Sequence, residues 1–174
     1  AIASRATGKL CKMRYDRDDD MILTGKRHDF RIDYSVGVDQ TGKILGIRFE
    51  HFVRCGWSQD LSLPVADRAM LHADNAYNLT DVEIVSHRLK TNTQSNTAFR
   101  GFGGPQGIIG IERAIDHIAH HLNLDPVSVR KTNFYKSSKS LEKDKLSMPD
   151  TTPYGMPVTD SISEKLLNTL SKTA

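Results

Sequence analysis

A glycine-rich stretch in the second half of the chain is the part of the sequence best suited to chemistry. Residues Ser95–Gly107 read SNTAFRGFGGPQG and combine four glycines, two aromatic rings and an arginine just before a long helical pattern. Glycine lets the backbone approach a ligand closely, and amides at a helix N-terminus favour anionic groups such as phosphate. Phe99 and Phe102 flank Arg100 in a loop too rich in glycine to bury both rings. We therefore expect at least one ring to face a planar ligand, the alternative being a plain glycine-rich start to a helix.

The glycine spacing excludes two nucleotide-binding motifs. Counted from Gly101 and Gly103, the third glycine of a dinucleotide fingerprint would fall on Gln106. No Gly-Lys-Ser/Thr sequence follows, so a Walker loop is also absent. A phosphate bound by this loop would be held in another way.

Two other clusters of side chains could in principle bind metals. Asp116, His117, His120 and His121 have spacings that could place two imidazoles beside a zinc ion, but no His-Glu-x-x-His pattern or separate third ligand is identifiable. The acidic run Asp16–Asp20 lacks the glycine and the final glutamate of a calcium-binding EF-hand loop. The favoured interpretation is a solvated helix flank for the histidine cluster and a solvated turn for the acidic run.

Composition excludes several classes of protein and partner. The chain has 174 residues, 24 Lys plus Arg against 21 Asp plus Glu, and 38% hydrophobic residues, which is typical of a globular protein. Its apolar runs are only a few residues long and its first residues do not form a signal peptide, so neither a membrane partner nor export is expected. Cys11 and Cys55 are predicted to be reduced, partly buried thiols. A net charge of +3, with lysines and acids interleaved after residue 135, argues against nucleic acid as a partner.

The elements that must position the glycine-rich stretch give an α+β pattern. Strict alternation over Phe30–Val38 and again from Leu45, with turn residues Asp39–Lys43 between them, predicts an antiparallel hairpin with one solvated face. Residues Ala1–Thr7 read as the last turns of a helix stopped by Gly8. Further strands are predicted over Lys9–Tyr15 and Asp81–Leu89, and helices over Leu61–Asp74, Pro105–Asn123, Pro126–Asn133 and Ile162–Leu170. We predict a mainly antiparallel sheet with segregated helices.

The sequence resembles a known family of enzymes. The stretch Ser95–Gly107 is similar to the molybdopterin-binding loop of xanthine dehydrogenases and aldehyde oxidases, the molybdenum hydroxylases. The resemblance covers almost the whole chain and is specific to the xanthine dehydrogenase branch, bacterial type being favoured. The other segments that carry it are Asp16–Met21, Thr24–His28, Ser58–Ser62, Asp67–Asn75, Arg130–Tyr135 and Thr152–Gly155.

The resemblance also implies a domain organisation. Residues 1–135 would be part of an α+β molybdopterin-binding domain. Residues 136–157, rich in Ser, Lys, Asp, Thr and Pro, would be a linker or long loop. Residues 158–174 would form a helix leading toward a second molybdopterin-binding domain that is missing from the sequence.

The resemblance further implies a role for each site residue. Arg68 would bind the substrate and stabilise negative charge that develops on it during the reaction, although its spacing alone favours an ordinary helix-surface arginine. Phe102 would pack against a purine, with Phe99 as its supporting neighbour. The backbone around Arg100, together with Gly101 and Gly103, would hold the molybdenum–molybdopterin cofactor, with no direct protein ligand to the metal.

The parent enzyme that this resemblance implies is a cytoplasmic oxidoreductase of purine catabolism. It hydroxylates hypoxanthine and xanthine to urate with water as the oxygen source. Its partners would be the purine substrate, the rest of the molybdenum-binding subunit, and the iron–sulfur/FAD subunit or domains.

Two family motifs are not found in these 174 residues. One is an upstream Gly-Gly-Phe-Gly-Gly-Lys-Glu segment, and the other is a Gly-Glu-Pro-Pro-like stretch in the later part that carries the general-base glutamate. We therefore expect the chain alone to lack the cofactor and to be inactive. The alternative function is a non-catalytic binding or scaffold domain with the same fold.

Overall fold

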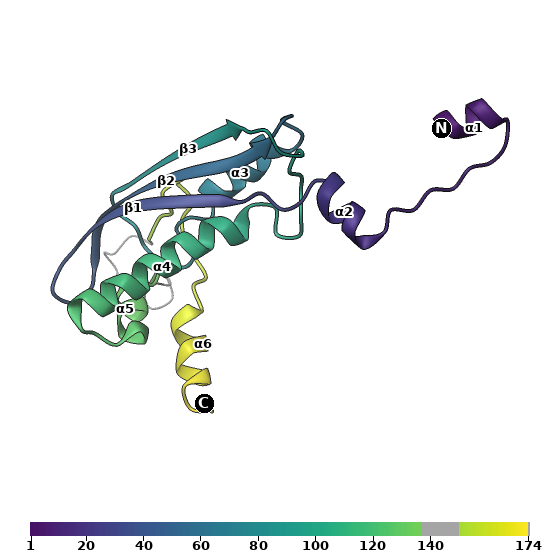
Figure 1. Ribbon diagram of the computed structural model, residues 1–174. Helices are drawn as coiled ribbons and strands as arrows, with labels where there is room; N and C mark the ends of the chain where they lie inside the picture. Colours follow the sequence, from purple (N-terminus) through teal and green to yellow (C-terminus); the bar gives the residue numbers. More distant parts are fainter. Residues whose placement is uncertain (137–149, 174) are drawn as a thin grey trace.

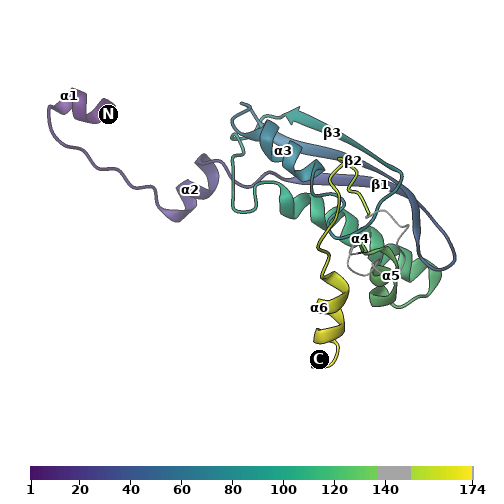
Figure 2. The same ribbon diagram turned by 180° about the vertical axis from the view of Figure 1, so that it is seen from behind.

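A three-stranded sheet with helices on one face forms the body of the computed structural model, which describes residues 1–136 and 150–173 (Figure 1). Helices α3 and α4 pack beside each other, α4 against β1 and α3 against β2 and β3 (Figures 1 and 2). The elements are α1 (Ile2–Thr7), α2 (Arg17–Leu23), β1 (Phe30–Val38), β2 (Ile44–Gly56), α3 (Ser62–Met70), β3 (Val82–Lys90), α4 (Gly104–Leu122), α5 (Pro126–Asn133) and α6 (Ser163–Leu170).

Strands β1 and β2 form the hairpin that the alternating pattern predicts. They pair antiparallel, with Tyr34 opposite Phe49. The side chain of Asp39 closes the turn, because its Oδ1 accepts hydrogen bonds from the amides of Thr41 (2.8 Å) and Lys43 (3.0 Å). Strand β2 extends further than predicted because it is the central strand and has backbone partners on both sides.

The third strand pairs in parallel, so the sheet is mixed rather than mainly antiparallel. Ile84 of β3 lies beside Phe49 of β2 in a parallel register. Parallel neighbours need a crossover connection, and α3 with the segment after it supplies one. The periodicity predicted this helix and this strand but contained no information on the direction in which the strand pairs. The α+β class itself is confirmed by the helices packed on this sheet.

The apolar face of α4 supplies the core that fixes the helix to the sheet. Ile111, Ile115 and Ile118 are buried as predicted and belong to one cluster with Phe49 of β2. Burying each such side chain contributes roughly 1.5–3 kcal/mol. On α3 the predicted apolar face is wrong at Leu61, which is exposed because it is the N-cap and precedes the helical turns that face the sheet.

The N-terminal segment contains two corrections. The predicted strand Lys9–Tyr15 forms no regular element, and none of the strands described for this chain pairs with it. Alternation alone does not make a strand, because the backbone needs a neighbour to bond with. The predicted turn at Asp16–Asp20 is instead the start of α2, since Asp16 Oδ1 accepts a hydrogen bond from the Asp19 amide (2.8 Å) and acidic residues favour a helix N-terminus.

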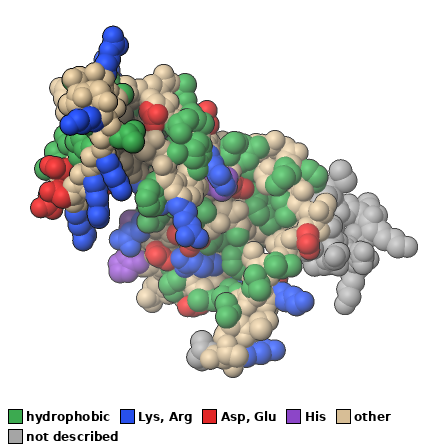
Figure 3. Space-filling view, turned by 90° about the vertical axis from the view of Figure 1, so that its right-hand side faces the viewer, with side chains coloured by type: hydrophobic (Ala, Val, Ile, Leu, Met, Phe, Trp, Pro, Cys, Tyr) green, Lys and Arg blue, Asp and Glu red, His purple; other side chains and the backbone are tan. Residues whose placement is uncertain are grey.

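This N-terminal segment projects away from the sheet (Figure 1). Helix α1 ends as predicted at Gly8, which has a left-handed φ of 66°. Residues 1–23 include no buried side chain. In the view onto this end of the molecule, basic and hydrophobic side chains are interspersed on the surface (Figure 3). Cys11 is accordingly exposed rather than partly buried, whereas Cys55 is buried, and both are free thiols.

The C-terminal part of the chain contains the predicted last helix, α6. Most of the predicted linker, residues 137–149, lies outside the described residues. Residues 150–157 form a local turn in which Thr151 pairs with Pro157. This turn contacts the body of the molecule, because the Tyr154 hydroxyl donates a hydrogen bond to the Met70 carbonyl. The predicted domain boundaries stay predictions. Over residues 1–136 and 150–173, no helix combines the length and the apolarity that crossing a membrane requires.

Candidate functional site

The glycine-rich stretch forms a tight double turn immediately before α4. The amide of Phe102 donates a hydrogen bond to the Phe99 carbonyl (2.7 Å), and the amide of Gly104 donates one to the Gly101 carbonyl (2.9 Å). Three successive residues, Gly101, Phe102 and Gly103, have φ values of 94°, 49° and 94°. Only glycine adopts this region freely, so Phe102 sits in a conformation that the surrounding turn must hold.

Close backbone contact places this loop directly against α3. A β-carbon on Gly103 would lie 2.0 Å from the Val65 carbonyl oxygen, and one on Gly107 would lie 2.1 Å from the Ala69 carbonyl oxygen. Any side chain at either position would push the two helices apart. The glycines therefore set the distance between the loop and the helix that carries Arg68.

Arg68 lies beside the loop. A β-carbon built on Gly104 would be 3.9 Å from Arg68 Nε and 3.5 Å from the His72 ring. The ring of His72 is oriented by the contact of its Nδ1 with the Arg68 carbonyl (2.9 Å). Arg68 of α3 and Gly104, the first residue of α4 after the loop, therefore lie side by side.

The two aromatic rings of the loop differ in exposure. Phe99 is 58% exposed, whereas Phe102 is half-buried. The guanidinium of Arg27 lies over the Phe99 ring, 4.6 Å from its centroid. Arg27 Nη2 also donates a hydrogen bond to the Arg100 carbonyl oxygen (2.6 Å). Phe99 is thus the more exposed ring of the loop, with Arg27 over one of its faces, and the prediction that a ring of this loop contacts a planar ligand stays a prediction.

The loop also offers hydrogen-bond donors. Within the described part of the chain, the amides of Arg100, Gly101 and Gly103 donate to no protein acceptor, and no side chain caps the start of α4. Arginines 27, 68 and 100 lie in or next to the loop, and the carboxylate of Asp60 contacts Thr97 further upstream in the stretch. Backbone amides and cations arranged in this way suit an anionic, polar group such as a phosphate-bearing cofactor.

A buried histidine connects three parts of the site, and sequence reasoning assigned it no role. His28 Nε2 is 2.8 Å from the Ser62 hydroxyl at the start of α3, and the His28 carbonyl accepts a hydrogen bond from Gln106 of α4 (3.2 Å). Burial lowers the pKa of His28, which favours the neutral ring. Arg27 and His28 both lie in a segment that carried the family resemblance. That resemblance was the only sequence signal for them, because their partners are distant in sequence.

Two members of the cluster on α4 that could have bound zinc have partners within the protein. Asp116 pairs with Arg130 (2.9 Å), and the His117 ring bonds to the Tyr34 hydroxyl. Among residues 1–136 and 150–173, no three His, Cys, Asp or Glu side chains converge in a way that could hold a metal ion.

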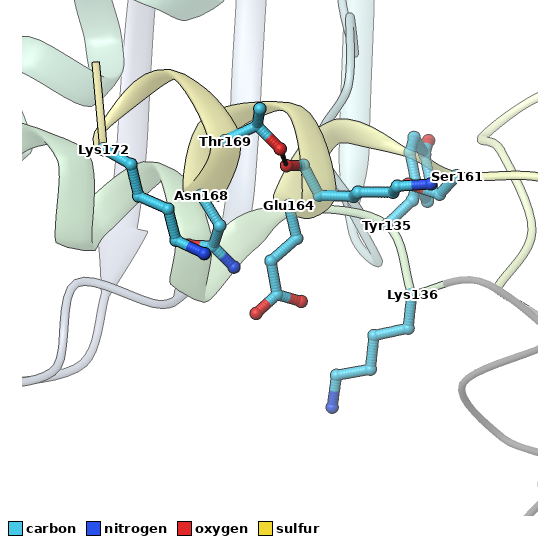
Figure 4. Close-up of a pocket in the computed structure, with 8 residues that line it drawn as sticks. Tyr135, Lys136, Ser161, Glu164, Asn168, Thr169 and Lys172 are labelled. Atoms are coloured by element: carbon cyan, nitrogen blue, oxygen red, sulfur yellow. Dashed lines mark hydrogen bonds between the residues drawn. The ribbon is translucent and has the colours of Figure 1, made fainter. Parts of the chain in front are cut away.

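A cavity of about 470 Å³ lies elsewhere, beside α6, and none of the predicted site residues lines it (Figure 4). Its walls are Tyr135, Lys136 and polar side chains of the segment that contains α6. The glycine-rich loop, not this cavity, is the place where the predicted residues meet.

Comparison with known proteins is consistent with this geometry. The family model described as "Molybdopterin cofactor-binding domain" matches residues 1–134. The chain is 45% identical over 135 residues to xanthine dehydrogenase/oxidase of Gallus gallus, and 46% identical over 134 residues to xanthine dehydrogenase 1 of Arabidopsis thaliana. These alignments cover 78% and 77% of this chain but 10% of each relative. The chain therefore spans about one tenth of the length of these curated relatives.

Solved structures show the same fold. The aldehyde oxidoreductase of Desulfovibrio desulfuricans superposes with a TM-score of 0.82 at 25% identity, covering 99% of this chain and 18% of that one. Quinoline 2-oxidoreductase of Pseudomonas putida 86 superposes with a TM-score of 0.76 at 23% identity, covering 99% of this chain and 21% of that one. The expected bacterial type stays a prediction.

Proposed function

The chain belongs to the molybdopterin cofactor-binding domain family, and from this membership we propose that it is the part of a xanthine dehydrogenase that presents one side of the purine and cofactor site. The complete enzyme hydroxylates hypoxanthine and xanthine to urate, with water as the source of oxygen. The observation that carries this proposal is the position of Arg68 beside Gly104, directly after the loop that carries Phe99 and Phe102.

The backbone of the loop is the part that would hold the cofactor. The amides of Arg100, Gly101 and Gly103 have no protein acceptor among residues 1–136 and 150–173 and so can donate to polar groups of a pterin or its phosphate. No side chain of this chain would ligate the metal. When bound, the molybdenum–molybdopterin cofactor supplies the two-electron oxidation of a substrate C–H bond.

The side chains at the rim would act on the purine. Phe102, with Phe99 as its neighbour, packs against the flat face of the heterocycle and excludes water from it. Arg68 binds the substrate and stabilises the negative charge that develops on the ring as it is attacked. An arginine suits this task because its planar guanidinium stays charged at any working pH and can donate two parallel hydrogen bonds.

Proton removal requires a group from outside these residues. The general-base glutamate and the upstream glycine-rich segment of the family are proposed to come from other parts of the molybdenum-binding subunit. Electrons would leave through iron–sulfur/FAD domains or a separate subunit, and the whole enzyme would work in the cytoplasm in purine catabolism.

The role of Arg68 can be tested in the complete enzyme that carries these residues. Arg68→Met keeps most of the side-chain length but removes the charge. We expect kcat/KM for xanthine to fall by about 10²–10³-fold, as when one donor to a developing anion is removed. Arg113→Met is the matched control, because Arg113 is an exposed arginine on the flank of α4. Equal activity of the two variants would contradict the assigned role.

The chain alone is expected neither to retain molybdenum nor to oxidise xanthine. Metal analysis and a xanthine-dependent dye-reduction assay on the purified 174-residue chain test this. Stoichiometric molybdenum with turnover would show that the chemistry is carried by other residues of this chain. A complete enzyme without molybdenum would instead favour a scaffold domain.

A further inference from the structure

We propose that Arg27 is a positioning residue that fixes the peptide plane between Arg100 and Gly101 and so aims the Gly101 amide at the cofactor. The inference rests on the proposed function, because that function assigns the loop to cofactor and purine binding. No role for Arg27 follows from the sequence, since 73 positions separate it from Arg100.

Arg27 contacts the loop in two ways at once. Its Nη2 donates a hydrogen bond of 2.6 Å to the Arg100 carbonyl oxygen, and its Cζ lies over the Phe99 ring, 4.6 Å from the centroid. A planar guanidinium can donate from its edge while it stacks through its face. A lysine ammonium has the charge but no plane, so it can reproduce the first contact and only part of the second.

Because of the geometry of the peptide bond, this contact also fixes the direction of the Gly101 amide. In a trans peptide the carbonyl of Arg100 and the amide N–H of Gly101 point in opposite directions. Holding the carbonyl on the Arg27 side therefore presents the amide on the other side, where no acceptor exists in the described part of the chain. Gly101 has a φ of 94° and no side chain to resist a flip of this peptide, so an external bond is needed to hold it.

Arg27 is itself held on both sides. The carbonyl of Lys26 accepts a hydrogen bond from the Thr97 amide (3.0 Å), and the carbonyl of His28 accepts one from the Gln106 side chain (3.2 Å). The two residues on either side of Arg27 are thus bonded to the two ends of the loop, before and after its tight turns. The side chain of Arg27 therefore starts from a backbone that is fixed relative to the loop, and its planar guanidinium loses less freedom per hydrogen bond than a lysine ammonium would.

Limited trypsin digestion of the full 174-residue chain tests the contact directly, because the carbonyl that Arg27 holds belongs to the Arg100–Gly101 bond that trypsin cleaves. The variants are Arg27→Met and Arg27→Lys. The control is Arg31→Met, which removes the same charge from an arginine that lies over Phe52 on the sheet, 5.5 Å from the ring centroid.

We expect mass spectrometry to show cleavage at Arg100 about tenfold faster in Arg27→Met than in the wild type, the effect of losing one hydrogen bond from a charged donor. Arg27→Lys should lie between them and Arg31→Met should match the wild type. Equal melting temperatures of Arg27→Met and Arg31→Met would exclude general unfolding as the cause. Equal cleavage rates at Arg100 in the wild type and Arg27→Met would overturn the inference.

The complete enzyme provides the functional measurement. Arg27→Met should lower the molybdenum content per chain and raise KM for xanthine by about tenfold with a smaller change in kcat, because binding geometry is lost. Partial recovery in Arg27→Lys supports positioning. Faster cleavage with unchanged molybdenum content and KM would overturn the positioning role and leave only a structural bond. Wild-type enzyme without molybdenum would refute the proposed function, whereas the cleavage rates would still decide whether Arg27 holds the peptide.

Discussion

Acid should destabilise this fold through one buried histidine, His51 in the centre of β2. Its side chain is 0% exposed, and its ring packs near those of Phe30 and Phe49, with centroids 6.1 and 6.0 Å away. Neither ring nitrogen has a hydrogen-bond partner within residues 1–136 and 150–173. Burial therefore lowers the pKa of His51 from 6.5 to about 4, since a charged ring would have no compensating contact.

The direction of the effect follows from this lowered pKa. In the unfolded chain His51 binds a proton near pH 6.5, whereas in the folded chain it does so only near pH 4. The stability that His51 contributes is therefore fully present above pH 6.5 and is lost as the pH falls toward 4. Between about pH 7.5 and pH 4.5 the loss amounts to about 2.5 kcal/mol. His28, also buried with a lowered pKa, adds to the loss, and Asp74, whose pKa is raised by burial, opposes it.

His51→Leu isolates the contribution of this one ring. Leucine has a similar volume and no titrating group, so we expect the free energy of unfolding at neutral pH to change by less than about 1.5 kcal/mol. Urea denaturation followed by circular dichroism at both pH values gives the loss for each protein. The variant should lose about 2.5 kcal/mol less than the wild type on acidification, and the contributions of His28 and Asp74 cancel in this comparison. An equal loss in both proteins would refute the reasoning.

Three further changes should affect stability. Gly107→Ala should lower the free energy of unfolding by about 3 kcal/mol in urea denaturation, because its β-carbon would lie 2.1 Å from the Ala69 carbonyl oxygen. In the control Gly37→Ala the new β-carbon meets no atom closer than 4.0 Å, so the loss should be less than about 1 kcal/mol. Asn133→Ala should lower the free energy of unfolding by about 2–4 kcal/mol, because the buried side-chain amide bonds to the backbone of Ile44, Gly42 and Val129. Asn168→Ala, at an exposed asparagine, should change it by less than about 0.5 kcal/mol. An equally small change in Asn133→Ala would contradict this prediction. Asp125→Ala removes the cap of α5 and should lower the free energy of unfolding by about 0.5–2 kcal/mol in thermal unfolding. Asp16→Ala also removes a cap, but from α2, which has no buried residue, so it should leave the main transition unchanged.

The local signals of the sequence predicted most of the elements. Alternation over Phe30–Val38 gave the strand with its observed bounds, and isoleucines three or four residues apart gave α4 to within one residue. These patterns work because they reflect which side of an element faces the core, and that is a property of neighbouring residues. The same reasoning failed at Lys9–Tyr15, where the alternation has no strand beside it in the described part of the chain.

The candidate site was likewise predictable only in part from the sequence. The sequence by itself determined that Ser95–Gly107 is a glycine-rich loop with rings and an arginine ahead of a helix, and the family resemblance added Arg68. Only the tertiary structure decided that β3 runs parallel to β2, that the glycines bring α3 to within backbone contact of the loop, and that Arg27 reaches the Arg100 carbonyl. Each of these depends on contacts between residues far apart in the chain, and such contacts leave no periodic trace in the sequence because they are set by how whole elements pack.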